Sequence, residues 1–363
     1  MNATHGHPIQ GPAAWTSDDL ARNDDWIWKL SVDELAEIDC AVRHARSLGK
    51  PVLWIDREDF PLPSFSRRLR RMSEEMENGR GFVLLRGLPP TYSREEMDFA
   101  YWGIGTYLGV AVTQGGRGEL LGLVEDEGGS SATKTTIRSY KTNLRIRFHA
   151  DRADWVSLLC VRKAKSGGAS LVVSAATVHN AILARRPDLI DVFYNDFYHS
   201  RQGDQAPGEA PAHPKPIFGF RDGYFTGQFS PGYVHSAQEF PEVPRLTPRQ
   251  TEAVEVFGTL AHELAFSMDF EPGDMQFLND HLTYHSRTAF EDHPEPERKR
   301  LLLRLWLAPP NSRPLPKSYE RLWGSIEPGV VRGGVPSKHG WRDIYGMRAH
   351  EEGRLKPSAI ANS

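Results

Sequence analysis

The nine residues from Asn143 to Asp151 read NLRIRFHAD, and apolar and polar side chains alternate along them. A period of two is that of a β-strand, whose successive side chains point to opposite faces of the sheet. We therefore expect Leu144, Ile146 and Phe148 on one face, and Asn143, Arg145, Arg147, His149 and Asp151 on the other. Five polar groups on one face belong either in water or in a functional cavity, and His149 and Asp151 would project side by side.

The simpler interpretation of this stretch is an exposed edge strand with scattered charges, because a His-x-Asp tripeptide is common. The next segment, Trp155 to Val161, is a largely apolar strand, which places the region in the core. The inner location makes His149 and Asp151 candidates for a chelating pair.

A third ligand is expected far downstream. Pro272-Gly273-Asp274 is a turn signal before a short strand, and His281 and His285 follow it. Two imidazoles and one carboxylate can hold a ferrous ion on one face and leave the opposite face open. We prefer His285 as the ligand and interpret His281 as a supporting or loop residue. A zinc hydrolase could use the same two His and one Asp with a water molecule.

The segment Arg298 to Leu307 is a further predicted strand, rich in leucine. Arg300, Leu302, Arg304 and Trp306 share one of its faces. Burying two arginines is costly unless they meet anions. They either pair with acidic residues of the fold or clamp a dicarboxylic acid, and a zinc hydrolase would not need such a clamp.

Composition limits the classes of function. The 363 residues are 39% hydrophobic and 25% charged, with a formal net charge of -3. No net basic field favours nucleic acid as a partner, and no apolar run is long enough to span a membrane. Cys40 and Cys160 are the only cysteines, so a disulfide framework or a cysteine zinc site is not expected. We expect a cytoplasmic protein.

The chain divides into one domain with two loose ends. We expect a flexible arm over residues 1–12, a single domain over 13–345 and a flexible tail over 346–363. Within the domain we predict a helical part to about residue 110, a strand-rich core over about 111–310 and a C-terminal extension. Helices are expected over 31–48, 65–78, 93–108, 177–193 (interrupted near Pro187) and 247–266, and residues 202–216 are a surface loop or lid candidate. Helices around many short strands predict an antiparallel barrel or jelly roll.

Five ordered motifs carry a family resemblance. They are Phe148-His149-Ala150-Asp151, Gly167-Gly168-Ala169-Ser170-Leu171, Pro272-Gly273-Asp274, His285-Ser286-Arg287 and Arg300-Leu301-Leu302-Leu303-Arg304. With them the chain resembles the taurine dioxygenase-like and clavaminate synthase-like iron(II)/2-oxoglutarate-dependent oxygenases, over roughly residues 79–310. The resemblance implies a mainly β fold with surrounding helices, a cupin-like double-stranded β-helix, which is a distorted jelly roll.

The resemblance also implies a reaction and its cofactors. His149, Asp151 and His285 would bind Fe(II), and Arg300 would pair with the distal carboxylate of 2-oxoglutarate. Arg304 would lie nearer the C1 end of this co-substrate or the substrate. Ser170 stands where the family commonly has a threonine that hydrogen-bonds 2-oxoglutarate. The enzyme would use O2 to hydroxylate, desaturate or cyclise at an unactivated C–H bond, and would release succinate and CO2. An intact Asp151 disfavours the related halogenases, which lack this carboxylate.

The substrate is expected to be a small, anionic or amino-acid-like metabolite. Arg145 or Arg147 would bind its anionic group, with Gln114 and Tyr284 as polar neighbours, although ion pairs within the fold are an equal alternative for both arginines. Trp155, Tyr224 and Phe225 could line an apolar wall, or could be plain core. A homo-oligomer is left open, as is a catalytically inactive cupin-like sensor that binds 2-oxoglutarate.

Overall fold

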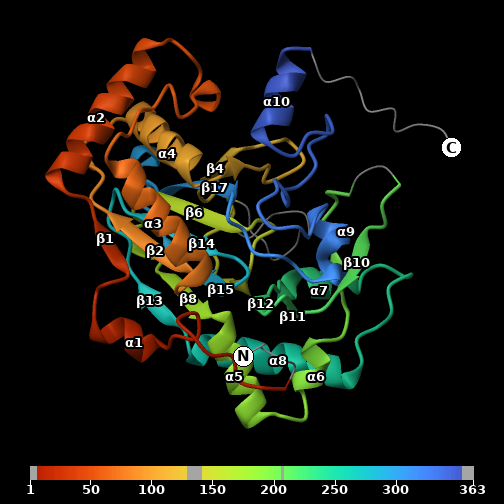
Figure 1. Ribbon diagram of the computed structural model, residues 1–363. Coiled ribbons are helices and arrows are strands. Elements are labelled where there is room, and N and C mark those ends of the chain that lie inside the picture. Colours follow the sequence, from red (N-terminus) through yellow and green to blue (C-terminus); the bar gives the residue numbers. More distant parts are fainter. Residues whose placement is uncertain (1–5, 129–140, 206–207, 354–363) are drawn as a thin grey trace.

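The computed structural model describes residues 6–128, 141–205 and 208–353 of the chain. It is a mixed helix-and-sheet fold in which helices cover two sheets (Figure 1). The α-helices are α1 (Ser17–Arg22), α2 (Val32–Ser47), α3 (Phe65–Asn78), α4 (Arg94–Leu108), α5 (Ala175–Arg185), α6 (Ile190–Phe193), α7 (Pro231–Ala237), α8 (Pro248–Glu263), α9 (Glu320–Trp323) and α10 (Ile344–Glu351). Short 3-10 helices span Val52–Trp54, Pro296–Arg298 and Lys317–Tyr319.

The larger sheet has seven strands. Its order is β1-β2-β14-β6-β17-β3, and β4 also pairs with β17. These strands are β1 (Ile27–Lys29), β2 (Phe82–Arg86), β3 (Val110–Ala111), β4 (Leu121–Val124), β6 (Trp155–Arg162), β14 (Met275–Asn279) and β17 (Leu301–Ala308). Strand β1 lies parallel to β2, and the other pairings in this sheet are antiparallel.

The smaller sheet has four antiparallel strands in the order β13-β8-β15-β5. They are β13 (Phe266–Met268), β8 (Ser170–Ser174), β15 (Thr283–Arg287) and β5 (Ile146–His149). Three two-stranded ribbons complete the fold: β7 (Ser166–Gly167) with β16 (Phe290–Glu291), β9 (Phe197–Ser200) with β10 (Ala212–Lys215), and β11 (Phe218–Arg221) with β12 (Tyr224–Gly227).

Three apolar layers fix the arrangement of sheets and helices. Leu303, Leu305 and Leu307 of β17 face outward, into the cluster that α2, α3 and α4 cover. On the other side of the same strand, Leu302 and Trp306 pack between the two sheets, together with Val172 of β8. A third cluster joins the outer face of the smaller sheet to α5, α6 and α8. The expectation of a mainly β chain is thus corrected to a mixed fold, because helices cover the outer faces of both sheets.

Helices α2, α4 and α8 begin one residue after their predicted starts. Ser31, Ser93 and Thr247 each form a capping box with the residue three positions later, which satisfies backbone donors at the start of α2, α4 and α8. The interruption expected near Pro187 is confirmed, because the segment 177–193 is divided into α5 and α6 with Pro187 between them; proline cannot donate to the helical ladder.

The strand expected over Asn143–Asp151 is shorter and irregular. His149 pairs with His285, whereas Ile146 pairs with Arg287, so three steps on β5 oppose two on β15. Such a bulge shifts the alternation of side chains by one residue. Arg147 is therefore exposed, while Ile146 lies in the same pocket as His149. The expectation that Arg145 and Arg147 share a face with His149 is wrong for this reason.

Both ends of the described chain pack against the domain. Ile9, inside the segment expected to be a loose arm, is buried, and its N–H donates to Asn180 Oδ1 at 2.7 Å. Residues 346–351, which we expected in the tail, belong to α10, and Arg348 on this helix donates to the carbonyl oxygen of Leu53. No helix in the described ranges is both long and apolar enough to cross a membrane.

The turn that leads into β14 depends on a glycine. Gly273 has a φ of +91°, and a Cβ there would lie 1.9 Å from the carbonyl oxygen of Leu88. We expect Gly273→Ala to lower the free energy of unfolding by more than about 2 kcal/mol, because strain and overlap with a rigid backbone add together. Gly49→Ala is the control, since Gly49 also has a positive φ but open space around it, and should cost about 1 kcal/mol. Urea unfolding measures both variants, and equal losses of unfolding free energy for Gly273→Ala and Gly49→Ala would contradict the role of the overlap.

Candidate metal centre and adjoining pocket

Three potential metal ligands meet between the two sheets. His149 at the end of β5, Asp151 just after it and His285 on β15 have ligand atoms that all lie within 4.8 Å of one another. The register that pairs His149 with His285 brings the two imidazoles to a centroid separation of 4.3 Å. Asp151 Oδ1 lies 3.7 Å from His149 Nε2, and its Oδ2 lies 3.9 Å from His285 Nε2.

Neighbouring groups orient these side chains. His149 Nδ1 is 2.9 Å from the carbonyl oxygen of Arg147, so a proton on Nδ1 leaves the Nε2 lone pair facing the centre. Asp280 Oδ1 accepts the N–H of Asp151 at 3.0 Å and lies 3.5 Å from His285 Nδ1. The indole N–H of Trp306 donates to Asp151 Oδ2 at 2.9 Å. Hydrogen bonds thus limit the rotation of His149 and Asp151, while His285 Nδ1 lies near Asp280 without a hydrogen bond among the described residues.

The protonation states suit a cation. Burial lowers the pKa of His149 to about 4 and also lowers that of His285, so both imidazoles are neutral near pH 7. Burial alone would raise the pKa of Asp151, but Arg304 and the two histidines outweigh it and lower that pKa. Two neutral imidazoles and a carboxylate are the donor forms that a divalent metal ion requires.

A pocket with buried arginines adjoins this centre. It lies between the sheets, and Ser170, Arg287, Arg300 and Arg304 contribute to its lining; Asp151 is the one carboxylate among its lining residues. Arg300 Nη1 and Arg287 Nε and Nη1 are buried without a hydrogen-bond partner in the described structure. Burial lowers the pKa of Arg300 to about 10 and that of Arg287 to about 9, so both remain cationic near pH 7. Orphaned cationic donors in a pocket fit an anionic ligand.

Arg287 was not predicted as a site residue from the sequence, although the strand period could have identified it. It stands two residues after His285, so the period of a strand places both on one face. Its Nη2 donates to the carbonyl oxygens of Thr142 and Leu144, which fixes the guanidinium against the start of β5. Ser170 lies where expected, and its hydroxyl is 3.3 Å from Gln276 Oε1.

Arg304 is held in place by a residue expected to contact substrate. Its Nε donates to Gln114 Oε1 at 2.7 Å, and Gln114 Nε2 in turn donates to the carbonyl oxygen of Arg304 at 2.8 Å. Arg304 Nη1 lies 3.7 Å from Asp151 Oδ2. Gln114 thus acts on the pocket through Arg304 and is not one of the lining residues.

The other residues expected at the substrate lie outside the pocket lining. Arg145 Nη2 is 3.2 Å from His262 Nδ1 of α8, and Arg147 is exposed. Tyr284 is fully buried on the opposite side of β15, with its ring edge-on to Phe257. Substrate contacts by these residues stay predictions.

The remaining candidates belong to the core or the surface. Trp155 is buried in the outer cluster of the larger sheet, and its indole N–H donates to Glu77. Phe225 is buried, whereas Tyr224 is exposed. The imidazole of His281 is fully buried against Asp154 at 2.8 Å, which agrees with its interpretation as a supporting residue.

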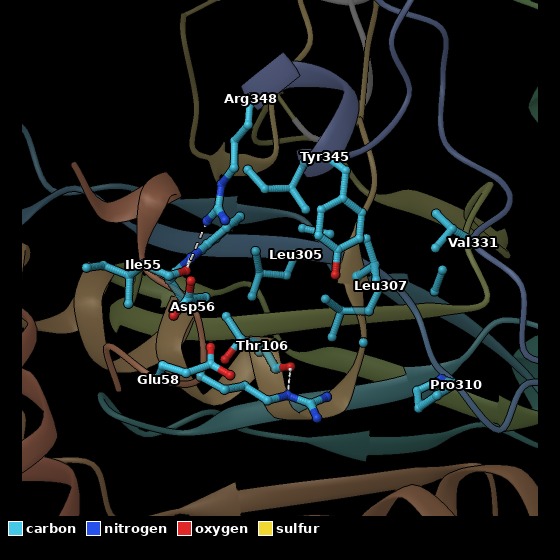
Figure 2. A pocket seen from close by; sticks show the side chains of 18 of the residues that line it. Ile55, Asp56, Glu58, Thr106, Leu305, Leu307, Pro310, Val331, Tyr345 and Arg348 are labelled. Atoms are coloured by element: carbon cyan, nitrogen blue, oxygen red, sulfur yellow. Dashed lines mark hydrogen bonds between the residues drawn. The ribbon is translucent and has the colours of Figure 1, made fainter. Parts of the chain in front are cut away.

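A second pocket lies on the outer side of β17, away from the candidate ligands. Figure 2 shows Leu305 and Leu307 beneath it and Tyr345 and Arg348 of α10 above it. Arg348 binds the carbonyl oxygen of Ile55, as the dashed line shows. No residue predicted for the site lines this pocket.

Comparison with known proteins identifies the family. Residues 45–306 match the family described as "Taurine catabolism dioxygenase TauD, TfdA family". This match spans most of the chain. The chain belongs to this family. It is a 2-oxoglutarate-dependent dioxygenase, an oxidoreductase whose cofactors are Fe(II) and 2-oxoglutarate.

Two relatives match nearly the whole length. FR-33289 synthase of Streptomyces rubellomurinus (strain ATCC 31215) is 32% identical over 329 residues, which cover 87% of this chain and 95% of the relative. Taurine hydroxylase-like protein SAT17 of Stachybotrys chartarum (strain CBS 109288 / IBT 7711) is 27% identical over 331 residues, covering 85% of this chain and 84% of that protein.

Solved structures share the fold. An asparagine oxygenase in complex with Fe(II), 3-hydroxyasparagine and succinate superposes with a TM-score of 0.61 at 17% identity, covering 78% of this chain and 93% of that one. The non-heme iron oxygenase OrfP, in complex with Fe and alpha-ketoglutaric acid, gives a TM-score of 0.57 at 14% identity, with coverages of 84% and 99%. At these identities the likeness establishes a common fold.

A buried lysine next to the site makes stability depend on pH. Lys215 Nζ donates to the carbonyl oxygens of Pro216 and Gln228, and Gln228 Nε2 donates to that of Asp151. Burial lowers the pKa of Lys215 from 10.5 to about 7. Between these values the unfolded chain binds more protons than the folded one, so the contribution of Lys215 to the free energy of unfolding rises with pH.

We therefore expect the wild type to gain stability relative to Lys215→Met as pH rises from about 7 to about 10. Urea unfolding of both proteins at several pH values measures this difference. The control is Lys317→Met, because the Lys317 side chain is 80% exposed and should give a flat difference. A flat difference for Lys215→Met as well would contradict a lowered pKa.

Proposed function

We propose that His149, Asp151 and His285 hold the Fe(II) of this dioxygenase. The clustering of their ligand atoms within 4.8 Å, their neutral and anionic states and their oriented nitrogens support this assignment. Two His and one carboxylate leave coordination positions open for other ligands, as non-heme iron oxygenases require. The clustering of the three ligand atoms between the sheets is the observation that carries the proposal.

We further propose that 2-oxoglutarate binds in the pocket between the sheets. Arg300, with Arg287 beside it, would receive the distal carboxylate, because both present buried donors that lack partners. The hydroxyl of Ser170 would contribute a further hydrogen bond from β8. Arg304 would lie toward the metal end of the co-substrate, since its Nη1 is 3.7 Å from Asp151.

When bound together, Fe(II), 2-oxoglutarate and O2 would provide the oxidising power to attack an unactivated C–H bond. In a hydroxylation, one atom of O2 enters the product and the other enters succinate, and CO2 is released. The protein contributes binding, orientation and exclusion of water. Trp306 and Arg304 keep Asp151 ionised and fixed, and Asp280 and the Arg147 carbonyl set the imidazole orientations.

We infer that the two facing sheets form the double-stranded β-helix that the resemblance implies, and that the substrate is a small anionic or amino-acid-like metabolite. One relative is named as taurine hydroxylase-like, and the fold neighbours are an asparagine oxygenase and an oxygenase in complex with hydroxy-arginine, which supports this class. The outcome would be hydroxylation, desaturation or cyclisation. Cys40 and Cys160 form no disulfide, which favours the proposed cytoplasmic location.

Co-substrate binding tests the arginine assignment directly. Anaerobic Fe(II) with 2-oxoglutarate should give a weak visible charge-transfer band, and its titration yields the affinity for 2-oxoglutarate. We expect Arg300→Met to weaken this affinity roughly ten- to hundredfold, because a charge-assisted contact is lost. The matched control is Arg298→Met, whose side chain is 57% exposed and pairs with Glu295, and it should bind as the wild type does. Equal affinities for all three proteins would contradict the assignment.

The same experiment separates the alternatives. A zinc hydrolase would give no charge-transfer band. A non-catalytic sensor would give the band but release no succinate with any substrate. Family membership favours the enzyme, and substrate-stimulated succinate release from a panel of small acids is its positive test.

Asp280 offers a test of metal positioning. Its Oδ1 accepts the Asp151 N–H and lies near His285 Nδ1. We expect Asp280→Ala to weaken Fe(II) binding about ten- to hundredfold, as the loss of a group that orients metal ligands commonly does. Asp280→Asn keeps an oxygen acceptor and should retain most of the affinity. Anaerobic competition with a chelator measures both variants, and an Ala variant that binds as tightly as wild type would refute the role.

A further inference from the structure

A second group of buried cations lies outside the pocket described above. Arg152 follows the candidate ligand Asp151 directly, Arg201 follows β9, and His213 lies on β10. The antiparallel pairing of β9 and β10 and the bond from Arg201 N–H to the carbonyl oxygen of Pro211 at 2.7 Å bring Arg201 close to His213. We call Arg152, Arg201 and His213 the cationic cluster.

The cluster holds more hydrogen-bond donors than the described structure satisfies. Among the described residues, Arg152 Nε, Arg201 Nε and Nη1, and both ring nitrogens of His213 are buried and have no hydrogen-bond partner; the neutral His213 ring offers one donor and one acceptor. Arg201 is 9% exposed and His213 is 4% exposed, so water does not readily replace the missing partners. Buried polar groups are nearly always satisfied, so unsatisfied donors on neighbouring side chains indicate a missing acceptor. An acceptor with several oxygen atoms would satisfy the guanidinium donors and the one N–H of His213.

The charges nearby leave this group positive. Arg342 adds a third guanidinium. Burial lowers the pKa of Arg342, and this effect outweighs the opposite effect of the nearby Glu209. Asp204 and Glu209 are the carboxylates that act on Arg152, and Glu209 Oε2 lies 3.4 Å from Arg201 Nη1. The three arginines outnumber these two carboxylates, and Lys215 and Arg321 act on His213 as further basic groups. Burial and then Arg201, Lys215 and Arg152 lower the pKa of His213 to about 2, which reports a positive field at this imidazole.

The cluster is fixed beside the candidate metal centre. Arg152 Nη2 donates to the carbonyl oxygen of Leu322 at 2.6 Å, which leaves Nε for another partner. On β10, Lys215 binds the carbonyl oxygen of Gln228, whose side chain binds that of Asp151. The chain from Asp151 to Arg152 is a single peptide link. The cluster is therefore joined to the candidate ligand Asp151 by one peptide bond and by hydrogen bonds through Gln228.

We propose that Arg152, Arg201 and His213 form an anion subsite that binds the oxyanion head group of the substrate, with the rest of the substrate extending toward the metal centre. This inference rests on the proposed function. It assigns the anion to Arg152 and Arg201, which keep buried donors without a hydrogen-bond partner among the described residues, and not to Arg145 or Arg147. The donors fit a carboxylate, a sulfonate or a phosphonate head group equally, since each offers two or more oxygen acceptors.

Small anions can probe the subsite without knowledge of the substrate. Acetate, methanesulfonate and methylphosphonate are titrated separately into the full-length protein loaded anaerobically with Fe(II) and 2-oxoglutarate, and binding is followed by ligand NMR. We expect at least one anion to bind, with its relaxation enhanced by the nearby paramagnetic Fe(II). The order of the three affinities identifies the head group.

Substitutions locate the binding. Arg201→Met and Arg152→Met should each weaken the anion roughly ten- to hundredfold, because each removes charge-assisted hydrogen bonds. The matched control, Arg185→Met, removes an exposed arginine that pairs with Glu263 on the surface and should leave anion binding unchanged. Circular dichroism checks that the variants fold, and if Arg152→Met does not fold, Arg201→Met decides alone.

The failures are distinguishable. Loss of the charge-transfer band in the wild type would refute the proposed function, and anion binding can still be measured in metal-free protein. A normal band combined with anion affinities that are equal in wild type and Arg201→Met would overturn the subsite alone. Binding without any relaxation effect of Fe(II) would overturn its position beside the metal centre.

Discussion

The pairing of β5 with β15 is the contact on which the site depends. It places His149 opposite His285, residues 136 positions apart in the chain, and so creates a metal-sized gap between two imidazoles. The bulge in β5 then decides which neighbours face the gap. A regular strand would have turned Arg147 toward the pocket, whereas the bulge turns Ile146 there and leaves Arg147 exposed.

This pairing is held by a buried ionic network around the turn between β14 and β15. Asp154 accepts from Arg332 and from His281, and Glu77 accepts from Arg313, all with little or no exposure. Burial raises the pKa of Glu77 despite Arg313, which shows how strongly this region is removed from water. Breaking one partner of such a pair leaves an uncompensated buried charge. The network therefore fixes the turn that carries Asp280 toward Asp151 and His285.

The sequence predicted the site where strands are regular. Period two placed Arg300 and Arg304 on one face of β17, and both line the pocket; the same rule applied to β15 would have found Arg287 beside His285. It failed at β5, because a bulge is set by the hydrogen-bond register with another strand and leaves no mark in local alternation. The roles of Gln114 and Asp280 could not be predicted from the sequence for a related reason. Their roles depend on contacts with residues more than a hundred positions away.

With the proposed assignments, the distribution of buried charge would direct the co-substrate and an anionic substrate to different residues. Arg287 and Arg300 lie between the sheets, where a dicarboxylic acid can reach them. The cationic cluster of Arg152, Arg201 and His213 begins at the residue after Asp151 and lies outside the lining of that pocket. Burial strengthens the Coulomb attraction between an acid and the arginines of the pocket or of the cationic cluster. The negative charge of Asp151 repels a carboxylate that has no cation beside it. A co-substrate and an anionic substrate would thus be drawn to separate ends, and the metal centre would lie between them.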